Sequence, residues 1–255
     1  MKLLLISNST NPGEKYLGWT LPYIEDFLKN NNIKKALFVP YAGVNVGDAH
    51  TLEQSYSNLF EKANSVFKDL GVKLESIHKA GNPVEAVEKA ECVIVSGGNT
   101  FHLVYELRRK KLMDVIRKRA LGGMPYIGWS AGSNIASPTL RTTNDMPIIE
   151  PESFNCLNLV PFQINPHYLD TEKHPVGFGG ETREDRINEF LTVNKEVTVI
   201  GLRESCLLEV NGEKMELKGK HGMLVFKYNK EEALKEKPKH YKEVPQGDVS
   251  QFFKL

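Results

Sequence analysis

The first half of the sequence alternates between short apolar runs and segments with helical spacing. Runs of four apolar residues at 3–6, 36–39 and 92–95 end in polar or turn-forming residues, as strands buried on both faces do. Between Thr51 and Leu70, apolar residues recur at helical spacing, which indicates an amphipathic helix. Because strands that alternate with helices favour parallel pairing, the chain is predicted to be an α/β protein. We expect a mostly parallel, doubly wound sheet with helices on both faces.

Shorter patterns extend this series along the chain. They predict a strand over 72–77, a helix from Asn82-Pro83, a helix from about 100 to 119, a strand over 125–129 with a short helix over 131–136, strands over 159–164 and 197–202, and a helix over about 183–191. We expect the last two strands to continue the same sheet.

An antiparallel hairpin is predicted near the end of this series. Asn211-Gly212 separates two strand-like runs at 207–210 and 214–217, and this dipeptide is the strongest short-range indicator of a hairpin. Two strands added in this way are expected at an edge of the sheet.

The length and apolar content fit one principal domain. With 255 residues and 40% hydrophobic content, the chain can bury one sizeable core, and we assign residues 1–230 to a single α/β hydrolytic domain. Residues 231–255 form a C-terminal tail that is part of this domain or docked on it. From Asn229 onward the chain is rich in lysine and has little periodicity, so we expect a solvated, loosely attached segment.

Charge and cysteine content narrow the class of partner. Lys and Arg total 33 against 32 Asp and Glu, so there is no strong field to hold nucleic acid or an anionic membrane, and we expect a small-molecule partner. The apolar run Met1–Ile6 is too short for a signal peptide, and the three cysteines are not closely paired, so a cytoplasmic protein with reduced thiols is expected. The sequence favours neither a monomer nor a homodimer.

The segment Gly128-Trp129-Ser130-Ala131-Gly132 carries the first indication of chemistry. It has the form Gly-x-Ser-x-Gly and lies between a predicted buried strand and a short helix, the context in which a tight turn exposes a nucleophilic serine. The alternative is an ordinary glycine-rich turn between a strand and a helix. The context favours Ser130 as a nucleophile.

A serine hydroxyl needs a base, and His167 is the best placed of the seven histidines. It follows a strand-like run, and the carboxyl ends of parallel strands open into the active crevice of such folds. His167 and His174 lack the spacing of a zinc pair, and there is no His-Glu-x-x-His motif, so no metal is expected.

A carboxylate is expected to orient the imidazole. The candidates are Asp145, Asp170 and Glu204, each of which could instead be a solvated loop acid. Glu204 follows the predicted strand 197–202, at the edge where Ser130 and His167 are also expected. Position therefore favours Glu204.

Two backbone N–H groups are expected to bind the oxyanion formed by attack on a carbonyl. One is that of Ala131, directly after the nucleophile. The other is expected from Gly97-Gly98-Asn99, where two glycines allow the backbone to approach a ligand. A phosphate-binding loop is the alternative for this segment, although neither common phosphate-loop motif is present.

Several ordered blocks, taken together, resemble the peptidase E family of α-aspartyl dipeptidases. They are Leu3–Gly13, Phe38–Gly43, Val95–Phe101, Tyr126–Asn134, Arg141–Ile148, Gln163–His167, Gly180–Arg186 and Val197–Leu202. The resemblance spans about residues 1–230, with departures at 169–179 and in the tail. It implies a cytoplasmic serine peptidase without a cofactor that cleaves dipeptides with an N-terminal aspartate.

The resemblance also implies roles for individual residues. It places the family's nucleophile, base and acid on Ser130, His167 and Glu204, and its oxyanion donors on Gly98 and Ala131. Asp145 lies in a matching block and is retained as a catalytic or structural acid.

Substrate binding is expected from Arg183 and Asn99. An arginine fork can hold the substrate's side-chain carboxylate through two hydrogen bonds, although Arg183 could also be an exposed arginine at a helix start. Two alternatives stay open: a related hydrolase of another aspartyl or acyl compound, cyanophycinase-like or an esterase, and an inactive small-molecule-binding homologue.

Overall fold

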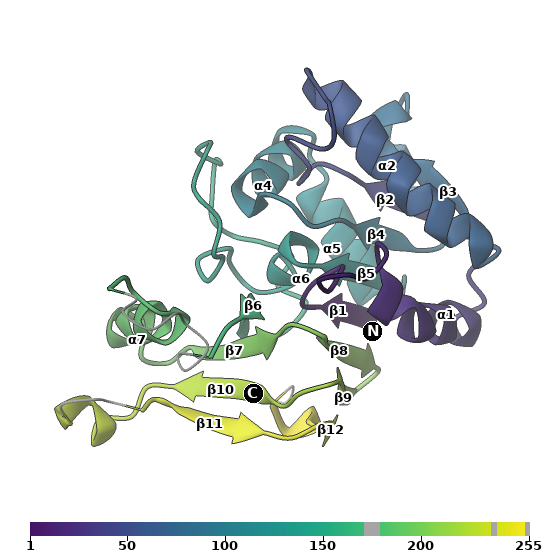
Figure 1. Ribbon diagram of the computed structural model, residues 1–255. Helices are drawn as coiled ribbons and strands as arrows, with labels where there is room; N and C mark the ends of the chain where they lie inside the picture. Colours follow the sequence, from purple (N-terminus) through teal and green to yellow (C-terminus); the bar gives the residue numbers. More distant parts are fainter. Residues whose placement is uncertain (171–178, 236–238, 253–255) are drawn as a thin grey trace.

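The computed structural model describes residues 1–170, 179–235 and 239–252 and contains a large mixed sheet (Figure 1). Its strand order is β12-β9-β8-β1-β5-β4-β2-β3. The bounds are β1 (Lys2–Ile6), β2 (Lys35–Val39), β3 (Lys73–Ser76), β4 (Val93–Val95), β5 (Tyr126–Trp129), β8 (Cys206–Asn211), β9 (Lys214–Gly219) and β12 (Gly247–Asp248). Strands β1 to β5 pair in parallel, as the sequence predicts.

Helices cover both faces of this sheet. Their bounds are α1 (Leu21–Asn30), α2 (Leu52–Asp69), α3 (Pro83–Lys89), α4 (Thr100–Arg109), α5 (Met113–Leu121) and α6 (Ala131–Asn134), whereas α7 (Arg183–Val193) packs away from this sheet. Alternate β1 residues belong to different clusters: Leu4 packs with residues of α1 and α2, and Leu5 with residues of α3 to α6. The predicted doubly wound α/β class is confirmed. Within the described residues, no helix is long and apolar enough to cross a membrane.

The predicted helix from 100 to 119 is two helices. α4 ends at Arg109, Lys111 adopts a left-handed backbone (φ 58°), and α5 begins at Met113. Leu112 is fully buried between them, and its N–H donates to the Leu107 carbonyl. No glycine or proline marks this break, so helical periodicity runs through it in the sequence.

A second, four-stranded sheet is the main departure from the predicted topology. Its order is β11-β10-β7-β6, with β6 (Gln163–Tyr168), β7 (Thr198–Arg203), β10 (Met223–Lys227) and β11 (Tyr241–Val244). The expectation that the strands at 159–164 and 197–202 continue the first sheet is therefore wrong, and the earlier one is shifted toward Tyr168. One face of the second sheet joins the main core, and α7 packs on the other, at the left of Figure 1.

The predicted hairpin is formed by β8 and β9. Asn211 pairs with Lys214, and Gly212 has the left-handed backbone (φ 65°) that such a turn requires. The hairpin lies toward one edge of the large sheet, where the short β12 adds a final pair of residues.

The C-terminal segment is more tightly integrated than its composition suggests. β11 pairs with β10, and β12 pairs with β9, so residues 241–248 contribute to both sheets. Val249 is fully buried, and Phe252 is 4% exposed within the main core. The expectation of a solvated, loosely attached segment is wrong for residues 241–252, because Val244, Val249 and Phe252 each fill a position in the main core.

Removal of the Phe252 ring tests this integration. Phe252→Ala should lower the free energy of unfolding by about 3 kcal/mol, because a buried ring is replaced by a cavity. Leu234→Ala is the matched control, since Leu234 lies in the same segment but is 85% exposed, and its effect should stay within about 0.5 kcal/mol. Urea unfolding of both variants measures the difference. Equal, negligible effects would contradict the packing of this segment.

Candidate functional site

Ser130 lies in a strained turn between β5 and α6. Its backbone has φ 54°, a left-handed value that a serine rarely adopts. The turn is tight because two backbone segments approach closely: a Cβ on Gly128 would lie 2.5 Å from the Gly132 carbonyl oxygen, and one on Gly132 would lie 2.3 Å from the Val95 carbonyl oxygen. The two glycines of the motif are therefore required by packing, and Ser130 is held in one conformation.

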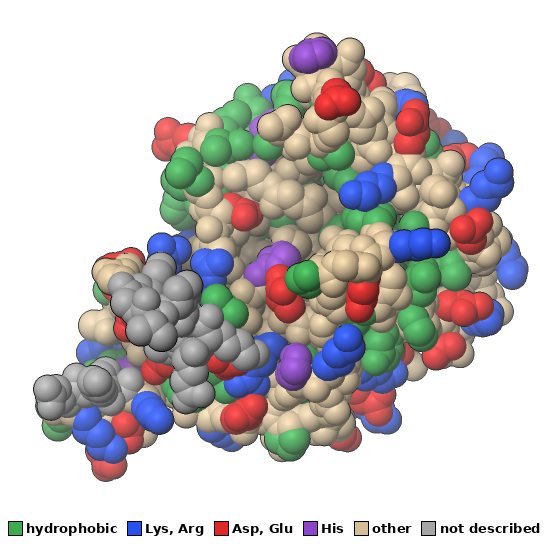
Figure 2. Space-filling view, viewed as in Figure 1, with side chains coloured by type: hydrophobic (Ala, Val, Ile, Leu, Met, Phe, Trp, Pro, Cys, Tyr) green, Lys and Arg blue, Asp and Glu red, His purple; other side chains and the backbone are tan. Residues whose placement is uncertain are grey.

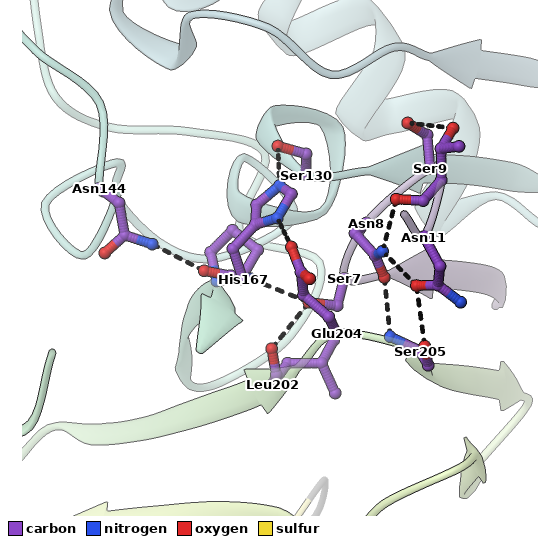
Figure 3. A network of polar contacts seen from close by, with 12 residues as sticks. Ser7, Asn8, Ser9, Asn11, Ser130, Asn144, His167, Leu202, Glu204 and Ser205 are labelled. Carbon is purple, nitrogen blue, oxygen red and sulfur yellow. Dashed lines mark hydrogen bonds and ion pairs between the residues drawn. The ribbon is translucent and has the colours of Figure 1, made fainter. Parts of the chain in front are cut away.

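Ser130, His167 and Glu204 form a continuous chain of hydrogen bonds (Figure 3). His167 Nε2 lies 2.8 Å from Ser130 Oγ, and His167 Nδ1 lies 2.7 Å from Glu204 Oε1. The hydrogen bond from His167 lowers the pKa of the Glu204 carboxyl, against a smaller opposing effect of burial. An ionised Glu204 can only accept, so Nδ1 carries the hydrogen and Nε2 is free to accept the proton of Ser130.

The three residues come from both sheets. Ser130 follows β5 of the large sheet, whereas His167 lies in β6 and Glu204 follows β7 in the second sheet. His167, like Ser130, has a left-handed backbone (φ 54°). The sequence predicts all three at strand ends, and the structure brings their side chains into contact. Such an arrangement can activate a hydroxyl for attack on a carbonyl carbon.

Asp145 and Asn99 instead serve the start of α4. Asp145 Oδ2 accepts from the Thr100 N–H (2.7 Å), from the Thr100 hydroxyl (2.6 Å) and from the Thr143 hydroxyl (3.0 Å). Asn99 caps the same helix by accepting from the His102 N–H, and its amide donates to the Met146 carbonyl. Glu204, rather than Asp145, is the carboxylate bonded to the imidazole. Both polar atoms of Asn99 are thus engaged within the protein.

Two backbone N–H groups near Ser130 are available to a ligand. Those of Gly98 and Ala131 have no hydrogen-bond partner among the described residues. Gly98 has φ 136°, and a Cβ there would lie 2.1 Å from the Ala42 carbonyl oxygen, so only glycine fits. Gly97-Gly98-Asn99 contains no basic residue that would support the alternative of a phosphate-binding loop. The two groups have the chemistry that an oxyanion requires.

Arg183 lines a cleft of about 770 Å³ together with His167 and Glu204. It is the first residue of α7, and in the part of the chain that the structure describes its guanidinium makes no hydrogen bond or ion pair. Burial lowers the pKa of Arg183, as does the neighbouring Arg186, whereas Asp145 raises it. A half-buried cation at the positive end of a helix is unfavourable unless an anion binds to it. Residues 171–178, which include His174 and most of the departing stretch 169–179, lie outside the described residues.

Several polar residues around the site were not identified from the sequence. Asn144 donates to the Pro166 carbonyl beside His167, and Asn8 accepts from the N–H of Ser205, beside Glu204 (Figure 3). Ser7 bonds to the backbone of β6 and β7. The sequence holds a usable indication for Ser7 and Asn8, because they follow the first predicted strand, and the other candidates are also expected at the carboxyl ends of strands.

Charged groups are dispersed around the site. On the face shown in Figure 2, acidic and basic side chains are interspersed, without a large region of one sign. Across residues 1–170, 179–235 and 239–252, no three His, Cys, Asp or Glu side chains are grouped so that they could hold a metal ion.

Comparisons with known proteins agree on one family. Residues 3–218 match peptidase family S51. The chain is 46% identical to Peptidase E of Nostoc sp. over 230 residues, 90% of each chain, and 46% identical to Peptidase E of Salmonella typhimurium over 231 residues, 91% of this chain and 96% of that protein.

Two crystal structures share the fold. One is a putative peptidase E protein from Listeria monocytogenes, with a TM-score of 0.61 and 23% identity over 86% of this chain and 98% of that one. The other is a peptidase from an acI-B1 actinobacterium, with a TM-score of 0.63 and 17% identity over 96% and 93%.

The lowered pKa of Glu204 predicts an acid-sensitive contribution to stability. A carboxyl whose pKa is lower in the folded than in the unfolded state stabilises the fold at pH values above its ordinary pKa of 4.5. This contribution is lost as the pH falls through the lower pKa of the folded state. Glu204→Gln should lower the melting temperature by a few degrees at neutral pH, since a half-exposed pair contributes at most about 1 kcal/mol. Below about pH 4.5 this difference should shrink.

Melting curves between pH 3 and pH 8 measure the effect. Glu152→Gln is the control, because Glu152 is exposed and has no hydrogen bond or ion pair among the described residues. A difference between wild type and Glu204→Gln that stays constant or grows in acid would contradict the assignment.

Proposed function

The chain belongs to peptidase family S51, and on that premise we propose that it hydrolyses dipeptides with an N-terminal aspartate through an acyl-enzyme. The protein is a serine peptidase. The observation that supports the proposal best is the series of hydrogen bonds from Ser130 through His167 to Glu204. These three residues act as a catalytic triad, and the strained turn at Ser130 acts as a nucleophile elbow.

Acylation begins at the aspartyl carbonyl carbon. Ser130 Oγ attacks this carbon while His167 Nε2 takes the hydroxyl proton, and Glu204 stabilises the imidazolium that forms. The developing oxyanion accepts from the N–H groups of Gly98 and Ala131. His167 then gives its proton to the departing amino group, the peptide bond breaks, and the aspartyl group remains on Ser130.

Deacylation repeats these steps with water. His167 removes a proton from water as the water oxygen attacks the ester carbon, and the proton then passes to Ser130 Oγ as the ester bond breaks. Free aspartate leaves, and the hydroxyl of Ser130 is restored. The residues named supply every proton transfer, so the proposal includes no cofactor.

Arg183 provides selectivity for aspartate. Its guanidinium is half-buried, lines the same cleft as His167 and has no carboxylate partner among the described residues. A substrate carboxylate would supply the missing anion and accept two hydrogen bonds from the fork. Neutral side chains of the same size cannot do so. The dispersed surface charge supports a small-molecule substrate rather than a nucleic-acid or membrane partner. The three cysteines, which are buried thiols, support a cytoplasmic location.

Loss of the nucleophile should abolish turnover without affecting folding. Ser130→Ala is expected to lower kcat for Asp-Leu on the order of 10⁶-fold, because members of such a triad act as one unit. Its melting temperature should match that of the wild type within a few degrees. Labelling with a fluorophosphonate should modify Ser130 in the wild type only. Turnover of Asp-Leu by a pure, folded Ser130→Ala protein would falsify the mechanism.

The specificity proposal is tested by comparing Asp-Leu with Asn-Leu. Arg183→Ala should reduce the preference for Asp-Leu by about 10- to 100-fold, the value of a charge-assisted hydrogen bond. Arg186→Ala is the matched control, since this nearby arginine already faces Glu181 at 3.6 Å. An unchanged preference in Arg183→Ala would place the determinant elsewhere. Similar turnover of Leu-Leu or a simple ester by the wild type would favour a hydrolase of broader acyl compounds.

A further inference from the structure

We infer that Ser7 is a positioning residue for this reaction, because its buried hydroxyl holds His167 at a break in the hydrogen bonding between β6 and β7. The inference rests on the proposed function, since it concerns the base of that mechanism. It adds a residue that directly follows β1 of the large sheet to a site whose base lies in β6, and whose acid follows β7, of the second sheet.

The backbone at His167 is a β-bulge. The register of β6 on β7 shifts between Asn165 and Tyr168, so that Pro166 and His167 together lie opposite Leu202. His167 also has a left-handed backbone (φ 54°). A bulge of this kind turns a side chain out of the regular alternation of the strand and leaves peptide groups without ladder partners. The orientation of the imidazole therefore depends on what binds those peptide groups.

Ser7 occupies the gap between the two strands. Its Oγ accepts from the His167 N–H at 2.9 Å and donates to the Leu202 carbonyl at 2.7 Å (Figure 3). One hydroxyl thus replaces the direct ladder bond that the bulge prevents. The Ser7 side chain is fully buried, so water cannot readily take over these bonds.

The same end of β1 also fixes the nucleophile. The carbonyl of Ile6 accepts from the Ser130 N–H at 3.0 Å and from the Ser133 hydroxyl at 2.7 Å. The N–H of Ser7 donates to the Cys206 carbonyl at 3.0 Å, which fixes Ser7 itself against β8. Ile6 and Ser7, which are adjacent at the end of β1, therefore fix the distance between the backbones of Ser130 and His167.

Removal of the hydroxyl should separate catalysis from substrate binding. Ser7→Ala leaves the His167 N–H and the Leu202 carbonyl unpaired, and a shift of the imidazole of about 1 Å is expected to lower kcat for Asp-Leu by about 10²-fold. KM should change little, because the Ser7 side chain is fully buried and so is not exposed to a bound dipeptide. The rate of fluorophosphonate labelling of Ser130 should fall by a similar factor, and this readout does not depend on which dipeptide is the substrate.

A matched variant separates positioning from simple destabilisation. Ser137 is also fully buried, and its hydroxyl accepts from the N–H of Ile164, on the same strand as His167, at 2.9 Å. Ser137→Ala removes a comparable bond and should lower the melting temperature but leave kcat and the labelling rate nearly unchanged. If Ser7→Ala does not fold, Ser7→Cys fills the same space with a weak donor and acceptor and should show the same loss of rate.

A spectroscopic readout decides the outcome even if the wild type cleaves no Asp-Xaa dipeptide. The Nδ1 proton of His167, bonded to Glu204, should give a far-downfield NMR resonance, assigned by its absence in His167→Gln. This resonance should move or broaden in Ser7→Ala or Ser7→Cys and stay in place in Ser137→Ala. An unchanged resonance in the Ser7 variants, or equal effects of the Ser7 and Ser137 variants on the labelling rate, would overturn the role of Ser7. An unlabelled Ser130 in the wild type would instead count against the proposed mechanism.

Discussion

The close backbone contact beneath Ser130 is the constraint on which the rest of the site depends. Gly128 and Gly132 let the end of β5, the start of α6 and the carbonyl of Val95 approach to distances that no Cβ allows. This packing forces Ser130 into a left-handed conformation and turns its hydroxyl toward His167. The strain is tolerated because the surrounding sheet is buried on both faces, and regular secondary structure on each side fixes the turn.

The second sheet explains how a base and an acid reach that hydroxyl. His167 lies within β6 and Glu204 directly after β7, and these two strands pair in parallel beside the carboxyl end of β1. Ile164 and Ile200 from these strands share a core cluster with Leu5 of β1. One apolar core thus fixes the positions of the two sheets relative to each other. The residues of the hydrogen-bonded chain, which come from both sheets, are therefore also held in place.

The elements that could be predicted from the sequence are those whose local pattern and tertiary role agree. The runs at 3–6 and 36–39 are buried on both faces, and Gly212 supplies the left-handed backbone that the hairpin turn needs, so both predictions hold. The break at Lys111 has no glycine or proline to mark it, and the assignment of β6 and β7 to a second sheet depends on contacts distant in sequence. The composition of the final segment does not reveal its packing, because a few buried residues, Phe252 among them, hold it in place.

Prediction of the candidate site was limited in a different way. The end of a strand identifies candidate catalytic side chains such as Glu204, because ligands of α/β folds bind outside the carboxyl ends of the strands. The residues around these catalytic candidates have a different role. His167 and Ser205 adopt left-handed backbones, so regular strand pairing stops there. Their unpaired backbone N–H groups must then bind short polar side chains. Ser7 and Asn8 do this: they directly follow β1 of the large sheet, and the N–H groups that they bind lie in β6 and just after β7 of the second sheet. The sequence places Ser7 and Asn8 directly after a strand, but the irregular backbone that they bind at His167 and Ser205 becomes visible only in the fold.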